Sequence, residues 1–201
     1  MPARSRTHGD VCQLHIALQY TEPLVWRRVL VPPELTLSRL HQTIQIAMGW
    51  TNSHMHEFRA GKKIYGAPDE DHDPFGITRR ADERHVLVRE LLPRIRSRAF
   101  YTYDFGDSWE HEISLEKLQA RDPATIYPLC IGGEMACPPE DCGGISGYYH
   151  LVEAMRDPQH PEHEEMVESM GEVYDPVGFT IEQVNRIFQR RKSRRTARRY
   201  L

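Results

Sequence analysis

Residues 101–113, YTYDFGDSWEHEI, constrain the fold most strongly, because they predict two strands joined by a tight turn. Successive side chains of a strand point to opposite faces of a sheet. The aromatic residues at 101, 103 and 105 therefore share one face, and Asp104 points the other way. In the turn, Gly106 permits positive φ and Asp107 can accept a hydrogen bond from its own backbone. The pattern predicts an antiparallel hairpin with one buried face.

The second strand of this hairpin carries a histidine on its apolar side. That side is formed by Trp109, His111, Ile113 and Leu115, while glutamates dominate the opposite side. A polar group on a buried face needs a partner. Two outcomes stay open for His111. It meets Asp104, Tyr103 or a metal ion, or it is a core histidine hydrogen-bonded to a carboxylate or a carbonyl.

Further strands are indicated by alternation and by apolar runs between turn signals. Residues 11–20 alternate cleanly, and residues 24–32 form a second run that two prolines end. Shorter strands are expected at 54–60, 62–66 and 126–130. Residues 85–92 fit either a short strand or a helical turn, and residues 67–82 predict a loop.

One early helix and three late ones complete the pattern. The helix at 35–50 has Thr36 as N-cap, Gly49 as its end and an inward stripe of Leu37, Leu40, Ile44, Ala47 and Met48. Later helices are expected at 147–156, from Pro161 as the first helical residue to Gly171, and after Thr180, with Ile181, Val184, Ile187 and Phe188 inward. The sequence thus predicts an α+β fold with a mostly antiparallel sheet, one early helix and a C-terminal group of helices.

The chain of 201 residues fits one domain, or one domain with a small appendage, and its charge is distributed unevenly. We expect a disordered N-terminus at 1–10, an α+β domain at 11–189 and a basic tail at 190–201. The tail predicts electrostatic contact with nucleic acid. The alternative is a solvated continuation of the last helix. The basic residues of the tail are Arg190, Arg191, Lys192, Arg194, Arg195, Arg198 and Arg199.

No apolar run approaches the roughly 18 residues that a membrane-spanning helix needs. The first ten residues are polar and resemble no secretory signal. We therefore expect a cytoplasmic protein without a membrane partner, in which the cysteines are reduced, buried or metal-binding.

Histidines and cysteines suggest a zinc site. His54 and His56 are two residues apart on an expected strand, so both are predicted to point to one face beside Phe58. Convergence of Cys130, Cys137 and one of the histidines His54, His56 and His111 would give a structural zinc. The alternative is that the thiols pack as small hydrophobic groups.

Acidic and aromatic residues suggest a pocket that could carry chemistry. The candidates are Trp50, Tyr103, Asp104, Asp107, Trp109, His111, Glu140 and Asp141. Aspartate, histidine and glutamate in one pocket could supply metal ligands and general bases for hydrolysis or nuclease action. Nucleophile elbows, P-loops and dinucleotide fingerprints are absent from the sequence.

Several stretches together resemble a known family. They are VWRRVLVP, LHQTIQIAMGWTNSHMHEF, YTYDFGDSWEHEISLE, ACPPEDCGGISGYYHLVEAMRDPQHPEHEEM and YDPVGFTIEQVNRIF, in this order over about residues 11–189. The chain resembles the family named after open reading frame three of an Ri plasmid, also labelled an insertion-element passenger protein of TnpR type. The positions that match its pattern are Trp26, Arg27, Gly49, Trp50, His54, His56, Phe58, Tyr103, Asp104, Gly106, Asp107, Trp109, His111, Cys130, Cys137, Pro138, Pro139, Glu140, Asp141, Gly143 and Gly144.

The resemblance implies a small α+β domain without an established reaction. Its TnpR label implies a resolvase accessory role at mobile elements. A serine recombinase itself needs a nucleophilic serine in an arginine-rich domain and a helix-turn-helix reader. The sequence shows neither clearly. Three hypotheses follow: a module associated with plasmids or transposons that binds nucleic acid or a protein, a metal-assisted hydrolase or nuclease, and a purely structural role for the aromatic and histidine cluster.

Overall fold

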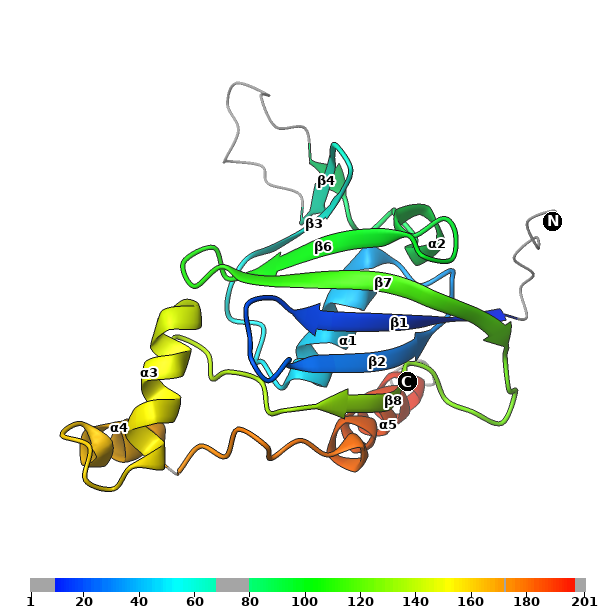
Figure 1. The fold of residues 1–201 in the computed structure, drawn as a ribbon. Coiled ribbons are helices and arrows are strands. Elements are labelled where there is room, and N and C mark those ends of the chain that lie inside the picture. The colour runs from blue at the N-terminus through cyan, green and yellow to red at the C-terminus, as the bar shows by residue number, and fades with distance from the viewer. Residues whose placement is uncertain (1–9, 68–79, 172, 198–201) are drawn as a thin grey trace.

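The protein is described by a computed structural model that covers residues 10–67, 80–171 and 173–197, with side chains up to Arg190. Its eight-stranded sheet has the order β5-β4-β3-β6-β7-β1-β2-β8 (Figure 1). Neighbouring strands are antiparallel except for β4 and β5. The strands are β1 (Asp10–Leu18), β2 (Trp26–Val31), β3 (His56–Ala60), β4 (Lys63–Gly66), β5 (Ala81–Asp82), β6 (Arg98–Tyr103), β7 (Trp109–Ala120) and β8 (Leu129–Glu134).

Helices cover one face of the sheet and extend beyond one end of it. The helices are α1 (Leu37–Met48), α2 (Val88–Leu91), α3 (Gly144–Arg156), α4 (His163–Met170) and α5 (Ile181–Ala197). Helix α1 packs against the sheet, and α5 contacts both α1 and β8. Helices α3 and α4 pack on each other beside the sheet (Figure 1). The predicted α+β class, with its single long early helix and its C-terminal helices, is confirmed.

The core forms where the sequence pattern places it. The predicted inward stripe of α1 is buried throughout, and Gly49 ends this helix with a left-handed φ of 103°. Along β7, every second side chain from Trp109 to Leu115 is buried, and along β6 Tyr101 and Tyr103 are buried. These faces meet α1, so apolar burial joins the early helix to the central hairpin.

Several predicted boundaries are wrong by a few residues. Helix α3 begins at Gly144 instead of 147, and α4 begins at His163 after Glu162 instead of at Pro161. The ambiguous segment 85–92 contains the short helix α2. Ile187 was expected inside but is 43% exposed, because α5 offers only a narrow inward face containing Val184 and Phe188.

At the N-terminal end one expected boundary is off by one residue, whereas at the C-terminal end the last helix continues into the tail, as one of the two readings of the tail expects. Asp10 already belongs to β1, while residues 1–9 lie outside the described residues. Helix α5 continues to Ala197 and therefore into the basic tail. No helix among the described residues is long and apolar enough to cross a bilayer.

We predict that Gly147→Ala destabilises the start of α3. A Cβ atom at Gly147 would lie 1.7 Å from the carbonyl oxygen of Cys142, so the backbone must shift. Overpacking of this kind costs about 2–3 kcal/mol of unfolding free energy. Urea denaturation would measure the loss, with Ser146→Ala as control. An equal stability of the two variants would contradict the prediction.

Candidate metal centre

The turn between β6 and β7 is built by Asp104. Its Oδ1 accepts a hydrogen bond from the Gly106 backbone N–H at 2.9 Å, and its carbonyl accepts one from the Ser108 N–H at 2.6 Å. Asp104 and Ser108 have positive φ values of 55° and 54°, whereas Gly106 does not. The expected roles of Gly106 and Asp107 in the turn are thus wrong. An aspartate side chain that caps its own turn tolerates the left-handed conformation.

This left-handed conformation also redirects the Asp104 side chain. Strand β6 ends at Tyr103, so the alternation of faces stops there and does not decide where Asp104 points. Asp104 is only 8% exposed, and its Oδ2 lies 3.6 Å from Nε2 of His54. The expectation that Asp104 simply points away from the Tyr103 face is therefore replaced by a buried carboxylate directed at His54, whose ring packs edge-on to that of Tyr103.

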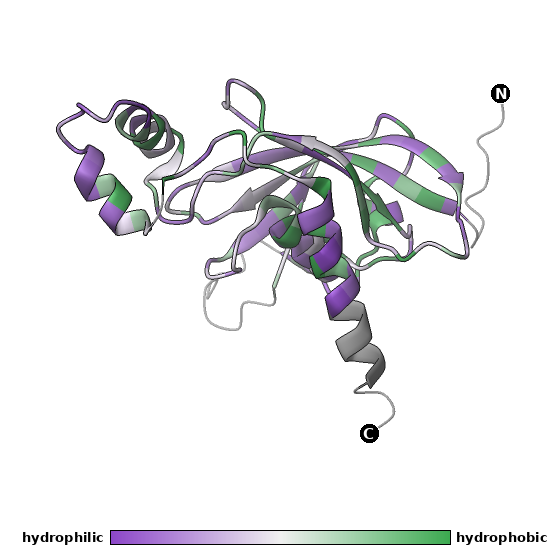
Figure 2. Ribbon diagram, turned by 90° about the horizontal axis from the view of Figure 1, so that it is seen from below, coloured by the Kyte–Doolittle hydropathy of each residue, from purple (hydrophilic) through white to green (hydrophobic). Residues whose placement is uncertain are grey.

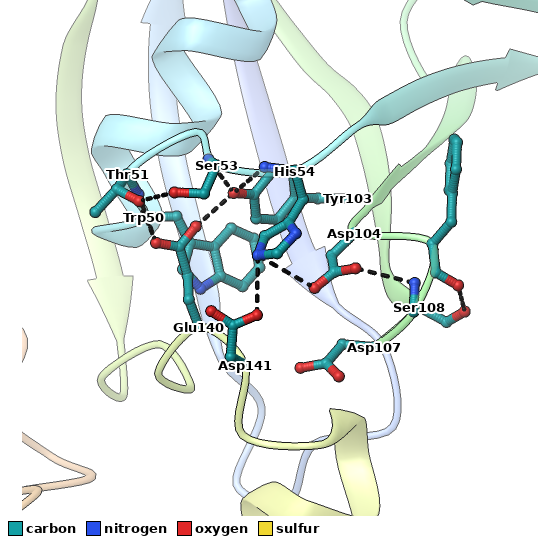
Figure 3. Close-up of polar contacts among 12 residues, drawn as sticks. Trp50, Thr51, Ser53, His54, Tyr103, Asp104, Asp107, Ser108, Glu140 and Asp141 are labelled. Atoms are coloured by element: carbon teal, nitrogen blue, oxygen red, sulfur yellow. Dashed lines mark hydrogen bonds and ion pairs between the residues drawn. The ribbon is translucent and has the colours of Figure 1, made fainter. Parts of the chain in front are cut away.

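A second carboxylate reaches the same nitrogen from a different loop. Oδ1 of Asp141 lies 3.0 Å from Nε2 of His54, and the carboxylate is 73% exposed (Figure 3). Asp141 has a φ of 59°, in the left-handed region. The loop before α3, the segment after α1 and the β6–β7 turn each contribute one side chain, so only the folded chain assembles the group.

The nitrogen between the two carboxylates has unused bonding capacity. Nε2 of His54 is buried and, despite the short distances, has no hydrogen bond of acceptable geometry. One donor atom from each of His54, Asp104 and Asp141 lies within 4.8 Å of the others. Imidazole nitrogen and carboxylate oxygen together suit zinc or manganese. Metal–ligand distances of about 2.0–2.2 Å require ligand atoms roughly 3–3.6 Å apart. The two pairs that include His54 Nε2 satisfy this at 3.0 and 3.6 Å, and the two carboxylates lie within 4.8 Å of each other.

Glu140 joins the two loops that carry His54 and Asp141. Its carboxylate accepts hydrogen bonds from the Tyr103 hydroxyl, the Thr51 hydroxyl and the Thr51 N–H, the last at 3.1 Å. The Tyr103 oxygen in turn accepts bonds from the N–H groups of Ser53 and His54 at 2.9 and 3.3 Å. The network holds the backbone on which His54 stands (Figure 3).

The protonation of this network follows from its contacts. Burial opposes ionisation of Glu140, but hydrogen bonds from Thr51 and Tyr103 together lower the pKa of its carboxyl below the ordinary value. Burial, reinforced by the bond to Glu140, raises the pKa of the Tyr103 phenol. Near neutral pH, Glu140 is therefore an anion that accepts a bond from a neutral tyrosine.

Aromatic packing and one hydrogen bond between the β6–β7 turn and the loop before α3 support the site. The Trp50 ring stacks on Tyr103 with centroids 4.9 Å apart, and its Nε1–H donates to the Pro138 carbonyl at 3.0 Å. Asp107 does not point at His54, because its Oδ2 accepts the Gly143 N–H at 3.3 Å. The predicted pocket residues Trp50, Tyr103, Asp104, Glu140 and Asp141 are thus brought together, and Asp107 fastens the turn to the loop before α3.

The two remaining members of the predicted pocket belong to the core. Trp109 and His111 are fully buried under Trp50. Nδ1 of His111 faces the carbonyl oxygens of Tyr101 and Trp109 at 3.2 and 3.0 Å. Of the outcomes open for His111, the core histidine bonded to a carbonyl is the one that the structure shows.

The predicted zinc ligands do not assemble. Among the described residues, the one group of three metal-binding side chains contains His54 but none of His56, His111, Cys130 and Cys137. His56 bonds Glu83 at 2.7 Å instead, because β3 begins only at His56 and leaves His54 in the preceding loop. Cys130 is buried with its thiol 3.4 Å from the Gly132 carbonyl, and burial raises the pKa of the Cys137 thiol. Both thiols therefore behave as packed, protonated groups.

Sequence reasoning missed a second polar cluster beneath this site. His41 of α1 stacks on His56 with centroids 3.5 Å apart, bonds the Tyr101 hydroxyl at 2.8 Å and contacts the Asn52 side chain. Glu83, which bonds His56, is 4% exposed. In the sequence, His41 belongs to no motif and Glu83 lies in a charged loop. No local pattern therefore indicates that the two residues share one cluster.

The nucleic-acid prediction for the tail stays a prediction. Arg190 is exposed, and the side chains of 191–201, including Arg191, Lys192, Arg194, Arg195, Arg198 and Arg199, lie outside the described residues. The structure therefore does not test contact between these side chains and a nucleic acid.

Comparison with known proteins agrees with the fold and gives no activity. Residues 10–183 match the family model described as plasmid pRiA4b ORF-3-like protein. The chain is 41% identical over 182 residues to the uncharacterized protein y4hQ of Sinorhizobium fredii (strain NBRC 101917 / NGR234), covering 89% of this chain and 90% of that protein. It is also similar to the crystal structure of a protein of unknown function, MM3350 from Methanosarcina mazei Go1, with a TM-score of 0.79 and 32% identity over 88% of this chain and 97% of that one.

Proposed function

The chain belongs to the plasmid pRiA4b ORF-3-like protein family, and from that premise we propose that it binds one divalent metal ion through His54, Asp104 and Asp141 and uses it for hydrolysis. The observation that carries the proposal is the buried Nε2 of His54, which lies 3.0 and 3.6 Å from two carboxylate oxygens without a hydrogen bond. An ion between these atoms would satisfy all three.

The arrangement favours a reactive ion over a structural one. Structural zinc is usually enclosed by four protein ligands, whereas catalytic sites provide three and leave a position for water. Here three ligands are present and Asp141 is 73% exposed, so solvent reaches one side of the group. A metal ion held by these three side chains would activate a water molecule for attack on an ester or phosphoester.

The remaining polar residues would position the ligands. Glu140 and Tyr103 hold the Ser53–His54 backbone, and Asp104 is fixed by its bond to Gly106. Such outer contacts commonly change metal affinity by about 10–100-fold. The resolvase accessory role rests on the TnpR label alone, and no contact described above supports it.

Metal binding is the first measurement. Protein purified without a histidine tag and treated with a chelator is titrated with Zn²⁺, Mn²⁺ or Mg²⁺ by calorimetry, and thermal unfolding is followed in parallel. We expect one equivalent of Zn²⁺ or Mn²⁺ to bind and to raise Tm, since at 100 times Kd binding stabilises the folded state by about 2.7 kcal/mol. His54→Ala and Asp141→Asn should weaken binding by roughly tenfold or more.

A matched substitution and a reaction assay complete the test. His85→Ala removes an exposed histidine outside the site and should leave metal binding unchanged. Metal-loaded protein is then assayed with nitrophenyl esters and phosphoesters. A protein that binds no metal, or whose affinity is insensitive to His54→Ala, would show that His54 only forms an ion pair with its neighbours. Metal binding without hydrolysis of any of these esters would retain the site and remove the proposed reaction.

A further inference from the structure

A strongly acidic arm and a strongly basic tail lie close together in the sequence. We define the acidic arm as residues 144–175, which comprise α3, α4 and part of the connection to α5. Its acidic residues are Glu153, Asp157, Glu162, Glu164, Glu165, Glu168, Glu172 and Asp175, against Arg156 as its one lysine or arginine. The tail at 190–201 holds seven arginines and lysines and no acid. Opposite blocks of this kind attract each other or a partner.

The acidic arm is poorly neutralised by the rest of the described chain. Helix α4 has no buried residue, and Glu164, Glu165 and Glu168 are exposed. Among the described ion pairs, the arm contributes only the contact between His150 and Glu162. Like charges on adjacent helical turns repel each other. A basic partner would relieve this repulsion.

The acidic arm also contains a groove that fits arginine side chains. A groove of about 430 Å³ on α3 is lined by Tyr149, Val152, Glu153, Arg156, Asp157 and His160. Glu153 and Asp157 can accept paired N–H bonds from a guanidinium. The Tyr149 ring is 38% exposed and can lie against the flat face of the same group. The lining has two carboxylates against a single guanidinium, that of Arg156, so with a neutral His160 it keeps a net negative charge that favours a further guanidinium.

The position of α5 directs the tail away from its own arm. Helix α5 packs on β8 and α1 and continues to Ala197. Figure 2 shows α5 leaving the body downward, whereas α3 and α4 stand together at the left end. Figure 1 separates the same elements. Because a helix rises 1.5 Å per residue in a fixed direction, α5 as far as Ala197 runs away from α3 and α4 of the same chain.

We propose that the basic tail of one copy docks on the acidic arm of a second copy, and that the exchange is reciprocal. A two-fold pair satisfies both tails and both arms with the same contact made twice. The docked segment is residues 191–201, and the surface that receives it is the groove on α3 with the exposed glutamates of α4. The contact is electrostatic, so salt weakens it as the screening length falls from about 30 Å at 0.01 M to about 8 Å at 0.15 M.

The first test is the mass of the full chain in solution. Sedimentation velocity is measured over a range of protein concentrations at about 0.01 M and about 0.15 M salt. We expect dimers at low salt that dissociate with dilution and with salt, and monomers under all these conditions after deletion of residues 191–201. A wild-type chain that stays monomeric at the highest concentration and lowest salt would overturn the proposal.

A charge exchange tests the pairing itself. The arm variant carries Glu164→Lys, Glu165→Lys and Glu168→Lys, and the tail variant carries Arg194→Glu, Arg195→Glu and Arg198→Glu. Each alone should lose roughly tenfold or more in dimer affinity, because three charges are reversed at each of the two equivalent contacts. An equimolar mixture should recover dimers, because each arm then meets a tail of opposite charge. Circular dichroism confirms that both variants are folded.

A control variant and a nucleic-acid assay separate docking between two copies from other roles of the tail. Glu34→Lys with Glu112→Lys reverses acids outside the arm and should leave the dimer intact. Failure of the mixture to recover dimers would show that the arm and tail do not pair and would overturn the proposal. The proposal is equally overturned if the tail shifts a nucleic acid duplex in a gel while the protein alone stays monomeric, since the tail would then serve nucleic acid.

Discussion

Arg27→Ala is expected to cost about 3–5 kcal/mol of unfolding free energy, because it opens a cavity and strips donors from buried carbonyls. Arg27 is 1% exposed. Its Nε–H donates to the Ala47 carbonyl at 2.8 Å, and Nη1 donates to the carbonyls of Trp26 and Glu134 at 2.8 and 2.9 Å. The guanidinium also lies 3.8 Å from the centroid of the Phe179 ring.

The size of this effect comes from the number of elements that Arg27 joins. One side chain of β2 bonds the end of α1 and the end of β8 and packs under the segment that leads into α5. Gly133 leaves room for this packing, because a Cβ there would lie 2.6 Å from the Phe179 ring and 2.9 Å from Cδ of Arg27. Loss of Arg27 therefore loosens a helix, a strand and the C-terminal segment together.

Urea denaturation, followed by tryptophan fluorescence, would measure the loss of unfolding free energy. Two further variants would separate the lost packing from the lost hydrogen bonds. Arg27→Met refills most of the volume but supplies no donor, so it should recover only part of the loss. Arg27→Lys keeps the charge without the planar fork and should also fall short of the native chain. A loss below about 1 kcal/mol for Arg27→Ala would show that the buried charge costs nearly as much as its contacts contribute.

The second large effect is a loss of stability in mildly acidic solution. Burial lowers the pKa of His111 to about 4, and the Arg27 charge acts in the same direction. Burial and the neighbouring His56 lower the pKa of His41 to about 4, although Asn52 and Glu83 oppose the shift. In the unfolded chain both imidazoles regain an ordinary pKa near 6.5.

The sign of the effect follows from these two values. Between pH 6.5 and 4 the unfolded chain binds more protons than the folded chain, so the free energy of unfolding rises with pH in that window. The stabilisation is complete above the unfolded pKa and is lost as the pH falls toward the folded pKa. We expect a loss of about 2 kcal/mol for each histidine between pH 7.5 and pH 5.

Denaturation curves at pH 7.5, 6 and 5, taken at about 0.15 M salt, would measure the slope. His111→Gln removes one of the two histidines whose pKa is lowered to about 4 and should make the slope shallower, while His85→Gln removes an exposed imidazole and should not. Carboxylates do not mimic the effect in this window. The pKa of Glu116, for example, is lowered to about 2 by its bond to Arg28. Its contribution to the free energy of unfolding is therefore lost only when the pH falls below the ordinary pKa of a glutamate. A flat profile from pH 7.5 to pH 5 would contradict the prediction.

Local sequence patterns predicted most of the strands and helices and the buried faces of α1, β6 and β7, but not β5, which lies in the predicted loop, or the exposure of Ile187. Alternation placed His111 inside the sheet, and helical spacing placed the stripe of α1 up to its end at Gly49. These features depend on the period of a single segment, two residues in a strand and 3.6 in a helix, so neighbouring residues carry the whole signal. Of the predicted pocket residues, Asp104 and Asp141 lie together beside His54, whereas Trp109 and His111 belong to the core.

Which of these residues meet depends on the tertiary fold. His54, Asp104 and Asp141 stand on three loops, and positive φ values at Asp104 and Asp141 set their directions, so strand alternation could not apply to them. Likewise His56 turns to Glu83 and His41, which are distant in sequence. The meeting of loops depends on strand order and on long-range packing around Trp50 and Arg27. Local periodicity carries no information about either.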